Sequence, residues 1–110
     1  MLDALQAEGL LSDVRYAEAY VAARSARGFG PVRIAMELAQ RGVGADTRAE
    51  ACPRDDRYWA SLAATARTKR FGAAPPQDFP ERARQARFLA QRGFSRAQIA
   101  SALQAEADDL

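Results

Sequence analysis

Apolar residues recur at three- and four-residue spacings along most of this chain, which is the period of an amphipathic helix. Over residues 12–27 this period predicts a long helix that buries Val14, Ala17 and Val21. Alanine is abundant throughout, whereas Val, Ile and Thr are sparse, so helix propensity agrees with the pattern. The first long element is therefore expected to be a helix.

A glycine-containing break at residues 28–30 ends this helix, because glycine adopts the backbone conformations that helix termini need. Pro31 suits the first turn of a second helix, where no backbone N–H donor is required. That helix is expected to bury Ile34 and Leu38 and to end at Gly42.

A short helix over residues 46–51 completes a three-helix unit, and a second unit follows in the same order. Its helices are expected at residues 55–71, at residues 81–92 and from Ser95 onward. Residues 73–80 are rich in proline and predict an extended loop. The expected core of this unit is apolar and aromatic: Tyr58, Trp59, Leu62, Ala63, Ala66, Ala86, Leu89, Ile99 and Leu103.

Two helix starts in this second unit carry the capping-box pattern. Asp78 precedes Glu81 by three residues, and Ser95 precedes Gln98 by three. In such a box each side chain satisfies a backbone N–H of the other residue. These pairs predict helix starts at Asp78 and Ser95.

The two units repeat each other in sequence. Residues 13–16 and 55–58 share an Asp-x-Arg-Tyr pattern at an offset of 42 positions. Residues 38–42 recur identically as residues 89–93, at an offset of 51, so the second unit carries nine additional residues. Repeats of this kind stack their neighbours to bury an apolar face. The sequence therefore predicts an all-α fold of tandem three-helix repeats in an elongated, curved array.

We assign the domains from these repeats. One repeat covers residues 11–53 and the other covers residues 54–110, with the proline-rich insertion at 73–80. Residues 1–10 are expected to be the trailing helix of a truncated first repeat, ended by Gly9. A cut array exposes an apolar end face, which favours self-association through this N-terminal face. The last residues are expected to fray.

The composition argues against an enzyme and for a cytoplasmic protein. No histidine is present, which removes the commonest general base and metal ligand. Cys52 is the single cysteine, so it fits a reducing compartment and is read as a packing residue. The acids Asp55 and Asp56 lie at a helix start, where capping explains them. No secretory signal or membrane span is visible, and we predict no cofactor and no metal site.

Charge is small in total and uneven in distribution. The formal net charge is +2, and residues 57–96 hold nine basic side chains against two acidic ones. Such asymmetry suits a surface that binds a polyanion or an acidic protein groove. It equally suits a solvated, arginine-coated helical surface. Tyr16, Tyr58 and Trp59 are read as core residues rather than as platforms for stacking bases.

Seven cations are the candidate partner contacts. Four lie where the two long helices end, a position at which a cation also stabilises the helix dipole by about 0.3–1 kcal/mol without any ligand. Three lie on the middle helix of the second unit beside Glu81 alone, so they form the least neutralised cluster, and arginine suits bidentate binding of phosphate or carboxylate. The seven are Arg24, Arg27, Lys69, Arg70, Arg82, Arg84 and Arg87. Arg33, Glu37 and Arg41, at four-residue spacing, instead predict an intrahelical ion-pair ladder.

Several of these stretches together resemble the RecX family of recombinase regulators. The resemblance rests on residues 11–17, 28–34, 37–38, 41–42 and 87–95, with Ile99. It implies three tandem three-helix repeats that bind in the groove of the RecA recombinase filament, together with weak DNA binding. It also implies inhibition of filament growth and of the ATPase, strand-exchange and coprotease activities of RecA, in DNA repair, recombination and the SOS response. A member is a modulator and not an enzyme.

Two other classes of function stay open at this point. A stand-alone helical nucleic-acid-binding protein would bind phosphates through the same arginines, and its affinity for DNA would fall steeply with salt. A purely structural helical scaffold would bind neither DNA nor RecA. No membrane partner is expected.

Overall fold

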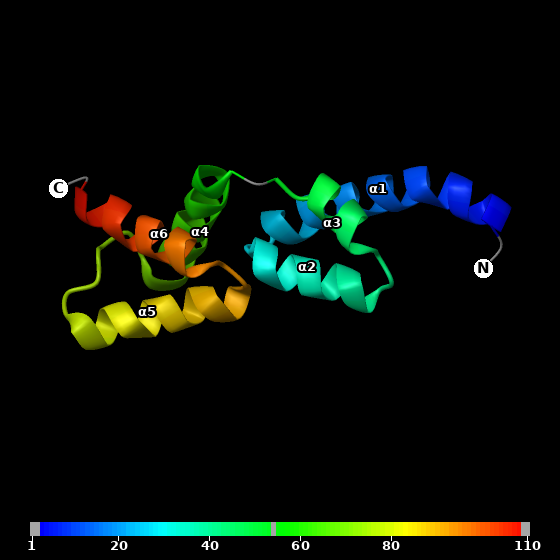
Figure 1. Cartoon of the computed structure of the whole chain (residues 1–110). Coiled ribbons are helices and arrows are strands. Elements are labelled where there is room, and N and C mark those ends of the chain that lie inside the picture. Colours follow the sequence, from blue (N-terminus) through cyan, green and yellow to red (C-terminus); the bar gives the residue numbers. More distant parts are fainter. Residues whose placement is uncertain (1–2, 54, 109–110) are drawn as a thin grey trace.

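The computed structural model describes residues 3–53 and 55–108, and within these the side chains of residues 13–53 and 55–104. The described residues form helices joined by turns and loops, so the predicted all-α class is confirmed (Figure 1). The helices are α1 (Asp3–Ala26), α2 (Pro31–Gln40), α3 (Ala45–Ala51), α4 (Asp56–Phe71), α5 (Phe79–Arg92) and α6 (Arg96–Asp108). Among the described residues, no helix has the length and apolar character needed to cross a membrane.

The helices form two three-helix units placed one after the other (Figure 1). Every extensive helix–helix contact lies within α1–α3 or within α4–α6. The chain is accordingly elongated, with principal extents of 57 × 21 × 19 Å. The buried apolar residues of the two units belong to one cluster, and tandem helical repeats are confirmed.

Burial repeats at both sequence offsets. Ala17 and Trp59, which are 42 positions apart, are 0% and 1% exposed and occupy equivalent sites on α1 and α4. Val21 and Ala63 form the next equivalent pair. The first repeat thus has alanine and valine at these two sites, and the second repeat has tryptophan and alanine. The offset of 51 relates further buried pairs: Leu38 and Leu89, Val43 and Phe94, and Ala51 and Ala102.

Helix ends follow the capping chemistry that the sequence predicts. The N–H groups of Gly42 and Val43 donate to the carbonyls of Ala39 and Leu38, and the N–H groups of Gly93 and Phe94 do the same in the second unit. This is the Schellman arrangement, and both glycines have the positive φ that it requires.

The predicted capping boxes form to different extents. Ser95 and Gln98 bond reciprocally, the N–H of each donating to the side chain of the other. Asp78 accepts a hydrogen bond from the backbone of Glu81. Glu81, however, turns to Arg84 and Gln85 instead of returning to Asp78. The Ser95 box is therefore complete, and the Asp78 box is half formed.

The predicted helix end at Gly9 is wrong. Helix α1 runs without interruption from Asp3 to Ala26, because one interior glycine costs only about 1 kcal/mol among good helix formers. The assignment of residues 1–10 to an earlier repeat stays a prediction. The expected self-association face lies outside the described side chains, and the last two residues of the expected frayed tail lie outside the described residues.

Two of the three aromatic residues predicted for the core lie at the surface. Trp59 is buried, whereas Tyr16 and Tyr58 are 43% and 42% exposed. Each tyrosine precedes a core position, Ala17 or Trp59, and a helix turns each successive side chain by about 100°. The equivalence of the two tyrosines was therefore correct, and their assignment to the core was wrong.

Arg67 is buried and fastens the proline-rich insertion to the second unit. Its guanidinium donates to the side-chain oxygen of Gln85 at 3.0 Å and to the carbonyls of Ala73 and Ala74 at the start of the loop. Its partner Gln85 is itself buried and donates to Glu81. Arg67 is therefore a core residue, although it lies next to the candidate contacts Lys69 and Arg70 in the sequence. The sequence feature that relates to this burial is the equivalence of Arg67 to Ser25, 42 positions earlier, which is also buried.

Candidate partner-binding surface

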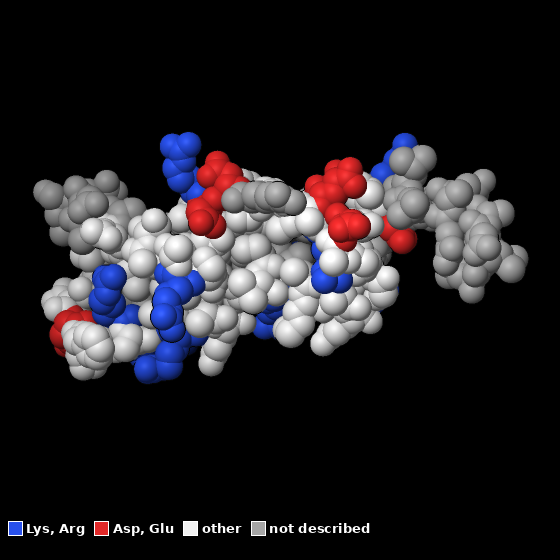
Figure 2. All heavy atoms as spheres, viewed as in Figure 1, with Lys and Arg blue, Asp and Glu red and all other residues white. Residues whose placement is uncertain are grey.

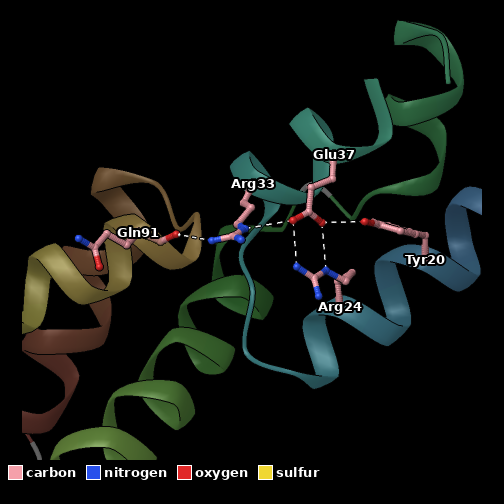
Figure 3. Close-up of polar contacts among 5 residues, drawn as sticks. All are labelled: Tyr20, Arg24, Arg33, Glu37 and Gln91. Carbon is pink, nitrogen blue, oxygen red and sulfur yellow. Dashed lines mark hydrogen bonds and ion pairs between the residues drawn. The ribbon is translucent and has the colours of Figure 1, made fainter. Parts of the chain in front are cut away.

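The two repeats meet end to end through their backbones. The C-terminal end of α5 faces the N-terminal end of α2: Gly30 N–H donates to the carbonyl of Arg92 at 2.7 Å, and Val32 N–H donates to that of Gly93 at 2.9 Å. The side chain of Arg33 adds a bond to the carbonyl of Gln91 at 3.2 Å (Figure 3). The backbone N–H groups at the start of α2 have no acceptor within their own helix, and they donate here to carbonyls at the end of α5 that have no donor within theirs. We call this contact the joint.

The joint depends on two glycines. A Cβ atom added to Gly30 would lie 2.5 Å from the backbone carbon and oxygen of Gly93. A Cβ atom added to Gly93 would lie 2.6 Å from the backbone nitrogen of Arg33. Real Cβ atoms do not approach backbone atoms so closely, so the two helix ends can meet only without side chains at these positions.

A stack of arginine and phenylalanine side chains crosses the joint. Phe29 lies in the first repeat, whereas Phe71 and Phe88 lie in the second, where their rings meet edge to face at 5.4 Å. Arg92 links the repeats, with its guanidinium 5.2 Å from the Phe88 ring centroid and 4.7 Å from that of Phe29. The other cations over these rings are Arg24, Arg33, Arg70 and Arg84. Each contact of this type contributes about 0.5–1 kcal/mol at exposed sites.

The stack ends on a carboxylate in the first repeat. Arg24 on α1 binds both oxygens of Glu37 on α2, at 3.0 and 2.9 Å, and Arg33 donates to Glu37 Oε2 at 3.0 Å (Figure 3). The Tyr20 hydroxyl donates to Glu37 Oε1 at 2.8 Å. Burial alone would raise the pKa of Glu37, but the hydrogen bonds from Arg24, Arg33 and Tyr20 outweigh it and lower this pKa from 4.5 to about 2. Glu37 is thus firmly ionised and ties α1 to α2.

The predicted Arg33–Glu37–Arg41 ladder is half correct. Arg33 pairs with Glu37 as expected for a four-residue spacing. Arg41 instead donates to the Tyr16 hydroxyl at 3.3 Å and lies 4.9 Å from the Tyr20 ring centroid. Arg24 takes the place of Arg41 at Glu37. Periodicity within one helix could not reveal this, because Arg24 arrives from a different helix.

The structure places the seven candidate contacts in different environments. Arg24 is held by Glu37, and Arg84 pairs with Glu81 at 3.0 Å. Arg84 also keeps the pKa of Glu81 lowered by its hydrogen bond. Among the described residues the others have no carboxylate partner and have exposed side chains: Arg27, Lys69, Arg70, Arg82 and Arg87.

Acidic and basic side chains are unevenly distributed over the face that Figure 2 shows. Figure 2 shows Lys and Arg atoms gathered over α5 on one edge, whereas Asp and Glu atoms lie mainly along the opposite edge, over α3 and the start of α4. Arg82 and Arg87 are exposed on α5, and the two repeats contribute Arg27 and Lys69 beside the joint. We call these four cations, with Arg70, the open basic surface.

A groove of about 140 Å³ opens beside the joint, between the two repeats. Arg27 and Gly28 line it from the first repeat, and Lys69 and Arg92 from the second. Its apolar wall includes Leu62, Ala66 and Phe88. Neither repeat forms this groove alone, so it could not be foreseen from the pattern of either one.

The chemistry of a typical active site is not gathered in the described part of the chain. No three His, Cys, Asp or Glu side chains come together there as a metal site would require. Cys52 is half-buried against the core, and burial raises the pKa of its thiol, which makes it a poorer nucleophile.

Comparison with known proteins gives the same domain pattern. Residues 12–51 match the family model of the second three-helix domain of RecX, and residues 56–103 match that of the third. Proteins named regulatory protein RecX are similar along most of the chain. The one from Halorhodospira halophila is 46% identical over 99% of this chain and 68% of its own length, and that from Chromohalobacter salexigens is 45% identical over 94% and 67%.

A third relative, from Pseudomonas entomophila, is 43% identical over 86% of this chain and 61% of its own length. The chain thus spans about two thirds of these relatives. Both three-helix units have a counterpart in the same family, in the same order. The chain belongs to the RecX family of regulatory proteins.

Proposed function

We propose that this chain binds the filament of the RecA recombinase and restrains it, limiting filament growth and the ATPase, strand-exchange and coprotease activities that depend on it. Membership of the RecX family supports the choice of partner. The single structural observation that carries the proposal is the elongated pair of repeats, held end to end by a backbone joint, with an open basic surface along it.

Such an inhibitor needs no bond-making step. A body 57 Å long can contact more than one subunit of a helical polymer, and a stiff body resists changes in the spacing between those subunits. Its effect is limited by the difference between its affinities for the trapped and the free states of the filament. The joint, the Arg–Phe stack and the Glu37 contacts supply the stiffness.

The open basic surface is the proposed contact region. Charged side chains at a contact accelerate encounter and exclude wrong partners more than they add affinity. Arg82 and Arg87 suit this task because their charges are not neutralised within the described part of the chain. Arg24 is instead engaged with Glu37, which ties α1 to α2, and Arg84 with Glu81 within α5.

Reversing two charges of this surface tests the proposal. We expect the double variant Arg82→Glu with Arg87→Glu to need about tenfold more protein for half-inhibition of the RecA filament ATPase, because two attractive contacts become repulsive. Arg15→Glu with Arg57→Glu is the matched control, since it reverses two exposed charges elsewhere. Circular dichroism should give unchanged helicity for both. Full inhibition by the folded Arg82 and Arg87 variant would contradict the assigned surface.

A salt titration separates filament binding from simple DNA binding. If phosphates were the target, the logarithm of DNA affinity would fall with the logarithm of salt concentration with a slope of about −0.7 to −0.9 per neutralised phosphate. We expect instead that ATPase inhibition persists at salt concentrations at which binding to naked single-stranded DNA is lost. Parallel loss of both would favour the nucleic-acid-binding alternative.

A further inference from the structure

We infer that the groove between the repeats receives an acidic side chain of the partner protein, with its carboxylate among Arg27, Lys69 and Arg92. This inference rests on the proposed function for the identity of the partner, and on the groove itself for the chemistry. The groove is formed by the end of α1, the second half of α4 and the end of α5. It therefore exists only when both repeats are held at the joint.

The size of the groove suits one side chain. Its volume is about 140 Å³, and a protein cavity of about 150 Å³ accommodates a molecule the size of benzene. Leu62, Ala66 and Phe88 offer apolar surface to the methylene groups of a glutamate or aspartate. The cations can then meet its carboxylate. Lys69 is exposed and Arg92 half-buried, so the carboxylate would be partly withdrawn from water.

The charge of the groove is positive and not compensated from within. Arg27 directly follows α1, and Lys69 and Arg92 lie in the last turns of α4 and α5. A helix C-terminus carries about half a negative charge, so three such ends leave about half of the three positive charges unbalanced. Among the described residues that line the groove, none is acidic. An anion from outside is therefore the complementary ligand.

The same molecule shows what such a group of cations binds. On the other side of the Arg–Phe stack, Arg24 and Arg33 converge with Tyr20 on one carboxylate, that of Glu37. There α2 supplies the acid. At the groove three cations line one hollow, and the described residues that line it include no acid. A partner side chain would complete the second site as Glu37 completes the first.

Shape favours a protein side chain over a nucleic acid. DNA presents a row of phosphates, which calls for cations spaced along an open surface. The groove is a single hollow with an apolar wall, and it has room for one group. Bidentate and charge-assisted bonds to a single carboxylate suit this arrangement.

The deciding variant fills the groove and keeps every charge. Thr65 lines the groove and is exposed, and its hydroxyl bonds only to the carbonyl of Ser61 in the same helix. We expect Thr65→Leu to weaken binding to RecA filaments about tenfold, as should Arg27→Gln with Lys69→Gln. Arg15→Gln with Arg57→Gln, which removes two charges elsewhere, should leave it unchanged. Sedimentation with RecA filaments assembled on oligo(dT) measures the affinity for the filament. The same assay with oligo(dT) alone measures the affinity for nucleic acid.

A second assay tests the groove without RecA. A fluorescein-labelled peptide alternating Glu and Ala should bind the full chain, and the same peptide with Gln in place of Glu should not. Thr65→Leu should lower the anisotropy signal of the Glu peptide to that of the Gln peptide. If wild-type protein binds this peptide but not filaments, the result contradicts the proposed function and supports the groove as a carboxylate site.

The opposite outcomes overturn the inference. Unchanged filament binding and unchanged peptide binding by a folded Thr65→Leu variant would show that the cations act without the groove. Equal loss of oligo(dT) binding and filament binding would assign the site to nucleic acid.

Discussion

Replacement of Gly93 by alanine is expected to lower the free energy of unfolding by about 2–5 kcal/mol. Gly93 has a φ of +98°, a conformation that costs other residues about 1–2 kcal/mol. Its new Cβ would also lie 2.6 Å from the backbone nitrogen of Arg33, and overpacking of this kind costs about 1–3 kcal/mol. Urea unfolding followed by circular dichroism measures the change.

Two further glycine variants separate these causes. Gly42 has a φ of +87° but open space around it, so Gly42→Ala measures the backbone cost alone. Gly30 has an ordinary φ of −97° but touches Gly93, so Gly30→Ala measures the close approach alone. We expect Gly93→Ala to cost more than either. Equal effects of Gly93→Ala and Gly42→Ala would mean that the joint opens freely and that the two repeats do not form a stiff body.

The joint variants also connect stability to the proposed function. Because the extensive helix contacts lie within each repeat, Gly30→Ala should leave both three-helix cores folded while changing how they are held together. Inhibition of the RecA ATPase should then fall although helicity is kept. Retained inhibition by a Gly30→Ala variant with a separated joint would show that the repeats act independently.

Replacement of Glu37 by glutamine is expected to cost about 2–3 kcal/mol at neutral pH. Glu37 is the shared acceptor for Arg24, Arg33 and Tyr20, and its side chain is only 16% exposed. Each pH unit between its folded pKa of about 2 and its ordinary value of 4.5 corresponds to about 1.4 kcal/mol. The ionised carboxylate therefore contributes up to about 3 kcal/mol. Glu18→Gln, which neutralises an exposed acid of α1, is the control and should change stability little.

The same residue predicts the direction of a pH dependence. A carboxyl whose pKa is lowered by folding stabilises the protein fully above its unfolded pKa and loses this contribution as the pH falls through the folded pKa. The contribution of Glu37 should therefore decline from about pH 4.5 toward pH 2. Urea unfolding of the wild type and of Glu37→Gln across this range should give curves that converge as the pH falls. A constant difference would contradict the assigned role of the carboxylate.

Local features of the sequence sufficed for the helices and the repeats. Capping by Ser95 and Gln98 and the glycine stops at Gly42 and Gly93 depend on residues within one turn of each other, so they can be read directly. The offsets of 42 and 51 positions relate core residues correctly because equivalent helices bury equivalent faces. The RecX resemblance came from the same residues, and family comparison confirmed it.

The sequence by itself thus determined most of the helical segments, the helix ends at Gly42 and Gly93 and the family of the chain, although it wrongly placed a helix end at Gly9. Only the tertiary structure decided that Arg67 is buried and that Arg24, rather than Arg41, pairs with Glu37. It also decided that Gly30 meets Gly93 at the joint, beside which the groove opens. The physical reason is distance along the chain. Helical periodicity orders neighbours three or four residues apart, whereas these contacts join helix ends and faces whose approach is set by packing.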